Sequence, residues 1–247
     1  MNQTKKERPQ QDHSPQSKCL EGPPMPIIAY SADGDNLEQL LTKLYYDHQH
    51  GSVDYPFQRI LKFEPTEEEL KAVFNTDELP DFSNTVTRIV RLPDMEPFTL
   101  EVPQYRIDGH WVRVLPSFLL GYKQYPIFVI EDVLNRDLPP KDITNGSDIK
   151  LPVIINDNST KPVWETKNNW KRWFKLNLSL FLSLLLQMCN ANKLQDVSLH
   201  QISHENLLNY FRIIRPNGWL RSLTDAAVRC HMKLKCAPWT YPTEKAA

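Results

Sequence analysis

A cluster of basic and amide side chains in one short stretch is the part of this sequence best suited to chemistry. Its members are Lys167, Asn168, Asn169, Lys171, Arg172 and Lys175. The three lysines are four residues apart, so a helix would place them on one face. Lysine suits a phosphate group, whereas arginine and asparagine can also hydrogen-bond the edges of bases. The pattern predicts a helix that binds nucleic acid, and the alternative is the solvated face of a core helix.

Apolar residues at helical spacing complete two amphipathic patterns. Trp170, Trp173 and Phe174 predict the buried side of the basic helix. The second pattern has an apolar stripe made of Trp219, Leu223, Ala226, Ala227, Cys230 and Leu234. The basic residues on its other side are Arg221, Arg229 and Lys233. We add these three cations to the predicted DNA-binding residues.

The formal net charge of −1 conceals a strong asymmetry along the chain. Residues 160–235 contain 12 Lys or Arg and 4 Asp or Glu, a net charge of +8. Residues 1–159 contain 16 basic and 25 acidic residues, a net charge of −9. The basic half could meet a polyanion, or the two halves could neutralise each other. Charge alone leaves both interpretations open.

Metal ligands and catalytic motifs are sparse. The spacing of Cys230, His231 and Cys236 matches no usual zinc site, and we expect Cys230 to be buried in the apolar stripe. His200 and His204 could share a metal on one helix, but no third ligand accompanies them. The sequence has no phosphate-binding glycine loop, nucleophile elbow or HExxH motif. We therefore predict a protein that is not an enzyme and uses neither a metal nor another cofactor.

The first half of the chain predicts helices followed by a small antiparallel sheet. "NLEQLLTKLYYDH" has the pattern of an amphipathic helix, and Thr66 with Glu69 forms a capping box at the start of another. Three β-branched or aromatic runs follow: "VTRIVRL", "FTLEVPQYRI" and "HWVRVL". Asp108-Gly109 between the last two runs predicts a two-residue hairpin turn. Pro103 lacks an N–H and therefore predicts an edge or bulged strand.

The second half predicts mainly helices. One helix starts at Pro126, and we place Trp111 and Phe118 in the core that joins it to the hairpin. Residues 137–162 are rich in Pro, Asp and Asn and predict a linker or insertion, with a short strand in "KLPVIIN". "ETKNNWKRWFKLNLSLFLSLLLQMC" predicts one long helix, and "SHENLLNYFRIIR" predicts a shorter one that ends before Pro216-Asn217-Gly218.

The expected location of the protein rests on features that the sequence lacks. The apolar run "LNLSLFLSLLLQMC" spans 14 residues, fewer than the ~20 that cross a bilayer. The polar N-terminus contains no signal-peptide pattern. The four cysteines show no spacing that suggests a disulfide framework. We therefore predict a cytoplasmic protein without a membrane span.

The stretch "LEVPQYRIDGHWVRVLPSFLLGYKQYPIFVIEDVL" resembles an uncharacterised family of bacterial, transposon-associated proteins. The likeness is closest at Val114, Leu115, Pro116, Ser117, Phe118, Leu119, Leu120, Tyr122, Lys123 and Tyr125. A weaker likeness recurs in "NNWKRWF" and "PNGWLRSLTDAAVRCHMKL", so the resemblance covers about a third of the chain. The family's layout is a four-cysteine zinc ribbon, a segment similar to "LLPSFLLPYKRYS" and a helix-turn-helix. The resemblance thus implies a DNA-binding protein of a mobile element.

The chain departs from this family at the metal site. Where the family has its second CxxC-Gly knuckle, this chain has Tyr105 and Asp108 before Gly109, so zinc cannot be carried over. We predict a degenerate ribbon in which Asp-Gly makes the same reversal without metal. The apolar residues that would have to hold it together are Ile89, Leu100, Val102, Trp111 and Val114.

These observations predict an α+β fold, with a small antiparallel β-sheet followed by a mainly helical C-terminal region. We expect tails at 1–24 and 239–247, an N-terminal domain at 25–117, a helix with linker at 118–162, and a helical DNA-binding region at 163–238. The predicted function is that of a non-catalytic, DNA-binding accessory or regulatory protein of a mobile element, with a transposase or another protein as a further partner. The alternative is a protein-interaction module whose basic helical half docks an acidic partner.

Overall fold

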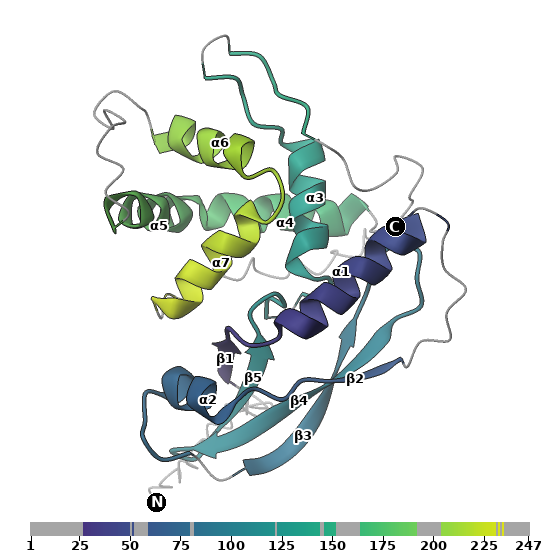
Figure 1. Cartoon of the computed structure of the whole chain (residues 1–247), viewed down its shortest axis with the longest axis vertical. Helices are drawn as coiled ribbons and strands as arrows, with labels where there is room; N and C mark the ends of the chain where they lie inside the picture. Colours follow the sequence, from purple (N-terminus) through teal and green to yellow (C-terminus); the bar gives the residue numbers. More distant parts are fainter. Residues whose placement is uncertain are drawn as a thin grey trace, which may run out of the picture.

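The computed structural model describes residues 27–49, 51, 59–79, 82–121, 123–143, 146–151, 164–191, 204–230, 232 and 234. These residues form an α+β fold, as the sequence predicts, in which helices α3 to α7 gather at one end and a five-stranded sheet lies at the other (Figure 1). The predicted tails and most of the predicted strand in "KLPVIIN" lie outside the described residues. The domain boundaries between the tails stay a prediction.

The sheet combines antiparallel and parallel pairs. Its strands are β1 (Ile27–Ser31), β2 (Ile60–Lys62), β3 (Phe82–Val90), β4 (Phe98–Ile107) and β5 (His110–Pro116). Strands β3, β4 and β5 pair antiparallel, which confirms the three predicted runs. Strands β1, which pairs parallel with β5, and β2, which pairs parallel with β4, were not predicted. The predicted antiparallel sheet is therefore the centre of a mixed one.

The hairpin turn has the backbone geometry that its sequence predicts. Asp108 has φ 48° and Gly109 has φ 79°, the pair of positive angles that a type I′ turn needs. Tight reversal of the chain at this point therefore needs no metal.

The edge-strand alternative predicted from Pro103 is wrong, because β4 lies inside the sheet. The β3–β4 register does shift close to Pro103, between Phe82 and Asn84 of β3. On one side of β4, Pro103 is the register partner of Thr85 in β3. On the other side it lies between the residues of β4 that pair with β5 and those that pair with β2. A proline is accommodated at this junction because neither of those two ladders includes it.

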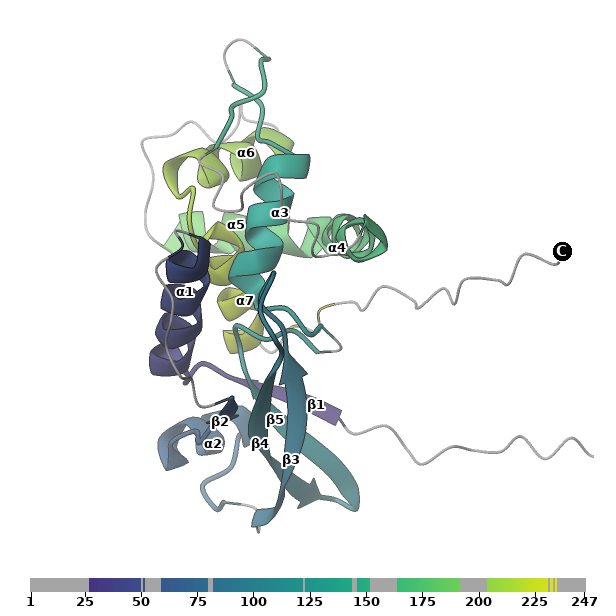
Figure 2. The same cartoon turned by 90° about the vertical axis from the view of Figure 1, so that its right-hand side faces the viewer.

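Helices α1 (Asp35–Gln49) and α2 (Glu67–Phe74) lie on one side of the sheet (Figure 2). Thr66 caps α2, accepting a hydrogen bond from the Glu69 amide at 3.3 Å, so the predicted N-cap is confirmed. The carboxylate of Glu69 does not return to Thr66 but accepts from the amide of Ala32, just after β1. Asp33 instead is the acceptor at Thr66, and its carboxylate accepts from both the amide and the hydroxyl of Thr66, at 2.7 and 2.9 Å. The capping residues thus also attach α2 to the end of β1.

The segment that carries the family resemblance is buried. All residues from Val114 to Gly121 have low exposure, and Phe118 is fully buried. Leu100, Val102 and Val114 are likewise in the core. Two residues expected there are not, since Ile89 is 39% exposed and Trp111 is 38% exposed. The guanidinium carbon of Arg106 instead lies over the Trp111 ring, 5.9 Å from the ring centre.

Helix α3 (Ile127–Asp137) is the centre of the helical end. It begins after Pro126, as predicted, and its residues from Val129 to Asn135 are all buried. A helix buried on every side must pair its polar groups internally. The polar side chains of α3 therefore decide which elements can pack around it.

Glu131 of α3 caps the N-terminus of α7 (Trp219–Arg229). Its carboxylate accepts hydrogen bonds from the backbone amides of Gly218 and Leu220, the latter at 2.7 Å. Helix α7 has no side-chain cap of its own, and Gly218 before it has φ 82°, a value that favours glycine. Glu131 thus provides the hydrogen-bond acceptors that the first amides of α7 need, and its ionised form is the one that the helix dipole favours.

Arg212 of α6 (His204–Ile214) caps α3 at its C-terminus. Its guanidinium donates to the carbonyls of Leu134, at 3.3 Å, and Leu138 at the end of α3, and it lies 4.7 Å from the ring centre of Trp219. The indole N–H of Trp219 donates to Asn135 Oδ1 at 2.8 Å. Helices α6 and α7 are therefore both held through α3.

The long helix predicted at 165–189 is two helices, α4 (Trp164–Leu176) and α5 (Leu178–Ala191), which join at Asn177. The Asn177 side chain donates to the carbonyl of Trp173 at 2.9 Å and is buried. Such a bond competes with the regular helix ladder. Phe181 packs across the junction, with its ring centre 5.9 Å from those of Trp173 and Phe174. Within the described part of the chain, no helix is long and apolar enough to cross a membrane.

The different burial of Phe118 and Trp111 predicts different costs of truncation. Phe118→Ala should lower the free energy of unfolding by about 3–5 kcal/mol, because it leaves a cavity in the core. Trp111→Ala should cost less, about 2 kcal/mol, because the ring is 38% exposed and loses only its partial burial and the cation–π contact with Arg106. Chemical denaturation of the two variants provides the measurement. Equal losses would show that the hairpin residue belongs to the core after all.

Glu131 predicts a pH dependence of stability. Burial, opposed by the amides of α7, raises its pKa from 4.5 to about 7. The folded protein therefore holds the proton of Glu131 more tightly than the unfolded chain does. This difference stabilises the fold fully below about pH 4.5, and the stabilisation is lost as the pH rises through about 7. The stabilisation lost is on the order of 3 kcal/mol.

Unfolding free energies measured from about pH 5 to 8 test this expectation. Glu131→Gln should remove the fall in stability, whereas the exposed Glu68→Gln, on α2, should retain it. Parallel pH profiles for wild type and Glu131→Gln would contradict the assignment.

Candidate nucleic-acid interface

Helix α4 has one apolar and one polar face. Trp170, Trp173 and Phe174 are buried, as predicted, and Tyr125 packs edge-on against Trp170 with ring centres 5.1 Å apart. The buried rings fix how α4 is rotated, because a helix cannot turn without exposing them. The basic residues are consequently held on the outer side.

The outer side of α4 faces an open hollow of about 570 Å³. The end of α3 and α4 line it together, with Asp137, Leu138, Asn168, Lys171, Arg172, Lys175 and Leu176. Four of the six predicted residues of α4 therefore share one surface. Lys167 is half-buried and Asn169 is exposed, and neither lines the hollow.

Asp137 is the one acidic group in the lining of this hollow. Its carboxylate lies 3.1 Å from the Lys171 ammonium and 3.5 Å from Arg136 Nε. A carboxylate in the last turn of a helix is unfavourable for the helix dipole, and these two cations offset that cost. Lys171, Arg172 and Lys175 outnumber Asp137, so the lining keeps a positive balance.

The described part of the chain contains no ion pair to Lys167, Arg172 or Lys175. Arg172 and Lys175 are also exposed. Their charges are therefore open to a ligand in solution, whereas that of Lys171 is shared with Asp137.

Arg221, in the second basic set, lies in an internal network instead of on an open face. Its guanidinium donates to both oxygens of Glu38 on α1, at 2.7 and 3.0 Å, to the Ser117 hydroxyl at 2.8 Å, and pairs with Asp225. The side chain is only 13% exposed. Burial raises the pKa of Glu38, and the charge of Arg221 opposes that rise. Arg221 is thus a contact between the sheet end and the helical end.

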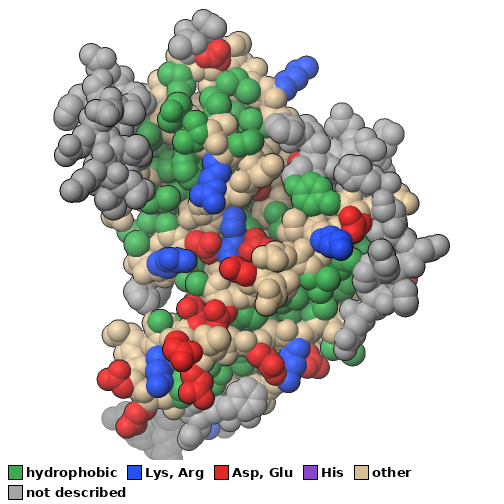
Figure 3. Space-filling view, in the orientation of Figure 1, with side chains coloured by type: hydrophobic (Ala, Val, Ile, Leu, Met, Phe, Trp, Pro, Cys, Tyr) green, Lys and Arg blue, Asp and Glu red, His purple; other side chains and the backbone are tan. Residues whose placement is uncertain are grey.

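The other members of that set are placed differently. Arg229 is exposed in the last turn of α7, and Lys233 lies outside the described residues. In Figure 3, basic and acidic side chains are intermixed at the centre of the face shown, and acidic ones gather at its lower left over α2. Neither Arg221 nor Arg229 lines the hollow beside α4.

The metal candidates gain no support as a site. Cys230 is exposed at the end of α7, so its predicted burial is wrong. His200, His231 and Cys236 lie outside the described residues. In the part of the chain that the structure describes, no group of three or more His, Cys, Asp or Glu could hold a metal ion.

Two further residues belong to this surface, Asp137 and Trp164, and neither was predicted. Asp137 gave no signal, because its approach to Lys171 depends on how α3 and α4 pack. Trp164 did give one: it lies three and four residues before Lys167 and Asn168, on the same helical stripe, and it is 72% exposed.

No protein-family model, curated protein or solved structure matches this chain. The architecture and the surface of α4 are therefore the basis on which a function can be proposed.

The network around Arg221 predicts that the two C-terminal arginines differ in role. Arg221→Ala should lower the free energy of unfolding by about 1–3 kcal/mol, because Glu38 and Asp225 lose their partner. Arg229→Ala should change it by less than about 0.5 kcal/mol, as is usual for an exposed side chain. Thermal and chemical denaturation of both variants checks this. An Arg221→Ala variant as stable as wild type would show that the network contributes nothing.

Proposed function

We propose that the protein binds DNA through the outer face of α4. The observation that carries this proposal is the hollow in which Lys171, Arg172 and Lys175 converge with the amide of Asn168, against one carboxylate. Cations on one face of a helix neutralise phosphates and release condensed counterions, which is the main source of affinity for a nucleic-acid backbone. Arginine and asparagine add donors that suit base edges.

We further propose that the protein acts without catalysis, in the cytoplasm, as an accessory or regulatory protein of a mobile element that works beside a transposase. The family resemblance of the segment around Val114–Leu120 supports this context. The predicted helix-turn-helix is not required for it, because α4 is the proposed DNA-binding element.

The alternative, an interaction module for an acidic protein, has one observation in its favour. Acidic and basic halves of the chain already pair with each other, through Arg221 with Glu38 and Lys171 with Asp137. The same structure limits this alternative, since Arg172 and Lys175 are exposed and the hollow is open. We therefore favour a polyanion as the ligand.

Titration of labelled duplex DNA at salt concentrations between about 50 and 200 mM tests the proposal. Arg172→Ala and Lys175→Ala should each weaken binding and flatten the slope of log affinity against log salt by about 0.9. The matched control is Lys71→Ala, an exposed lysine on α2, which lies at the other end of the molecule in Figures 1 and 2. This control should leave the slope unchanged.

Asp137 supplies a variant of opposite sign. Asp137→Asn should strengthen binding, because it frees Lys171 and removes a charge that repels phosphate. Absence of binding by wild type and Asp137→Asn at low salt, to duplex and to single-stranded DNA alike, would contradict the proposal. If Arg172→Ala and Lys71→Ala had equal effects, the DNA would not bind at α4, and the proposal would be wrong about the surface.

A further inference from the structure

Trp164 is the first residue of α4 and, at 72%, the most exposed of the large apolar side chains among the described residues. An indole in this position contributes little to the core. Its stripe along α4 continues through Lys167, Asn168, Lys171 and Lys175, so an aromatic ring stands at the head of a row of cations.

The spacing along this row is regular. Each helical residue rises about 1.5 Å, so successive lysines of the row are about 6 Å apart along the axis. Trp164 lies less than one turn before Lys167. A ligand that follows the row would therefore meet an aromatic face and then three cations in succession.

An aromatic ring beside a track of cations is the combination that binds single-stranded nucleic acid, because the cations follow the backbone and the ring stacks on a base. In a duplex the faces of the bases are covered by their neighbours, and only their edges are open in the grooves. Trp164 could gain from stacking only where a base is unpaired. A stacking contribution from Trp164 would therefore favour single-stranded over duplex nucleic acid.

We propose, as a refinement that rests on the proposed function, that α4 takes single-stranded nucleic acid with one unpaired base stacked on Trp164. The backbone then runs along the row of lysines into the hollow beside Asp137. The positive end of the helix dipole, at the N-terminus of α4, favours a phosphate next to the stacked base.

The refinement is tested with labelled oligonucleotides of about 15 nucleotides, single-stranded and as the matching duplex. Trp164→Ala should weaken single-strand binding roughly five- to a hundredfold, the range measured for loss of one aromatic stacking partner. It should leave duplex binding and the thermal midpoint unchanged, because the side chain is outside the core. Trp164→Phe should restore most of the single-strand affinity, since it keeps an aromatic face.

Trp111→Ala is the matched control, because Trp111 is also an exposed tryptophan beside an arginine but lies on the hairpin. It should bind both ligands as wild type does. If Trp164→Ala weakens neither ligand, or weakens both equally, the stacking inference is overturned while DNA binding stands. If wild type binds neither ligand, the proposed function itself fails. If Trp164→Phe does not restore binding, the ring does not act by stacking.

Discussion

The buried carboxylate of Glu131 and the guanidinium of Arg212 hold the helical end together around α3. Each is taken out of water at a cost, which raises the pKa of Glu131 to about 7 and lowers that of Arg212 to about 10. Each recovers part of that cost from backbone groups at a helix end. Glu131 accepts from the amides that begin α7, and Arg212 donates to the carbonyls that end α3. Leaving either charge unpaired in this interior would be strongly unfavourable.

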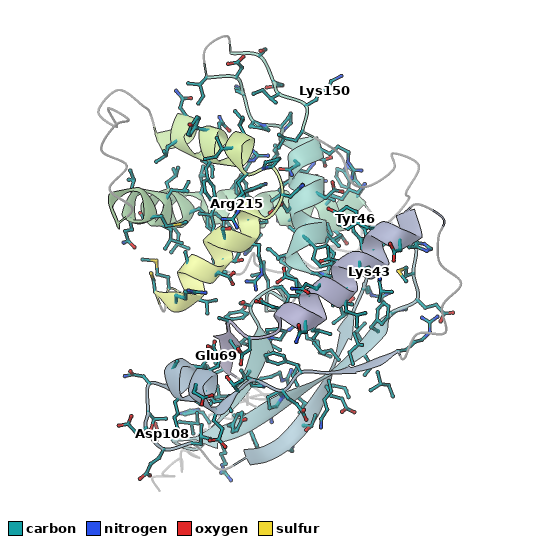
Figure 4. The ribbon with its side chains drawn as sticks, viewed as in Figure 1. Lys43, Tyr46, Glu69, Asp108, Lys150 and Arg215 are labelled. Atoms are coloured by element: carbon teal, nitrogen blue, oxygen red, sulfur yellow. The ribbon has the colours of Figure 1, made fainter. Side chains whose placement is uncertain are left out.

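The position of α4 follows from this arrangement. Its aromatic face packs toward the residues that precede α3, through Trp170 and Tyr125, and toward α7, where Phe174 meets Trp219 edge-on with ring centres 5.6 Å apart. Trp219 is itself fixed by Asn135 and Arg212. The cations of α4 therefore stand on a rigid support, and a rigid surface loses less entropy when it binds. Other cations are outside this surface: Lys43 and Arg215 lie on α1 and just after α6 (Figure 4).

Local patterns in the sequence were sufficient where local forces decide. Asp108-Gly109 adopts the turn that such a pair favours in a tight hairpin, Thr66 caps α2, and the rings at 170, 173 and 174 are buried. Pairing between strands that are distant in the chain leaves no such local pattern in the sequence. Strand β2 has three residues and gains its place from its register with β4, a partner distant in the chain. The break at Asn177 was also missed, because it depends on one side chain that donates to the Trp173 carbonyl alongside the backbone N–H of Asn177.

The candidate site shows the same division. Helical spacing identified Lys171, Arg172 and Lys175 as neighbours, and the hollow brings them together. The same reasoning grouped Arg221 with Arg229, yet Arg221 is enclosed by Glu38, Ser117 and Asp225 from three parts of the chain. Sequence spacing gives the face of a helix, but only packing decides whether that face meets solvent or another element.

Hydrogen–deuterium exchange of the whole protein, with and without a saturating oligonucleotide, tests the central claim most directly. If α4 is the nucleic-acid surface, added protection should be confined to Trp164–Leu176 and the end of α3 near Asp137, while the sheet exchanges as before. Protection centred on the β4–β5 hairpin, or none at all despite binding, would contradict this account.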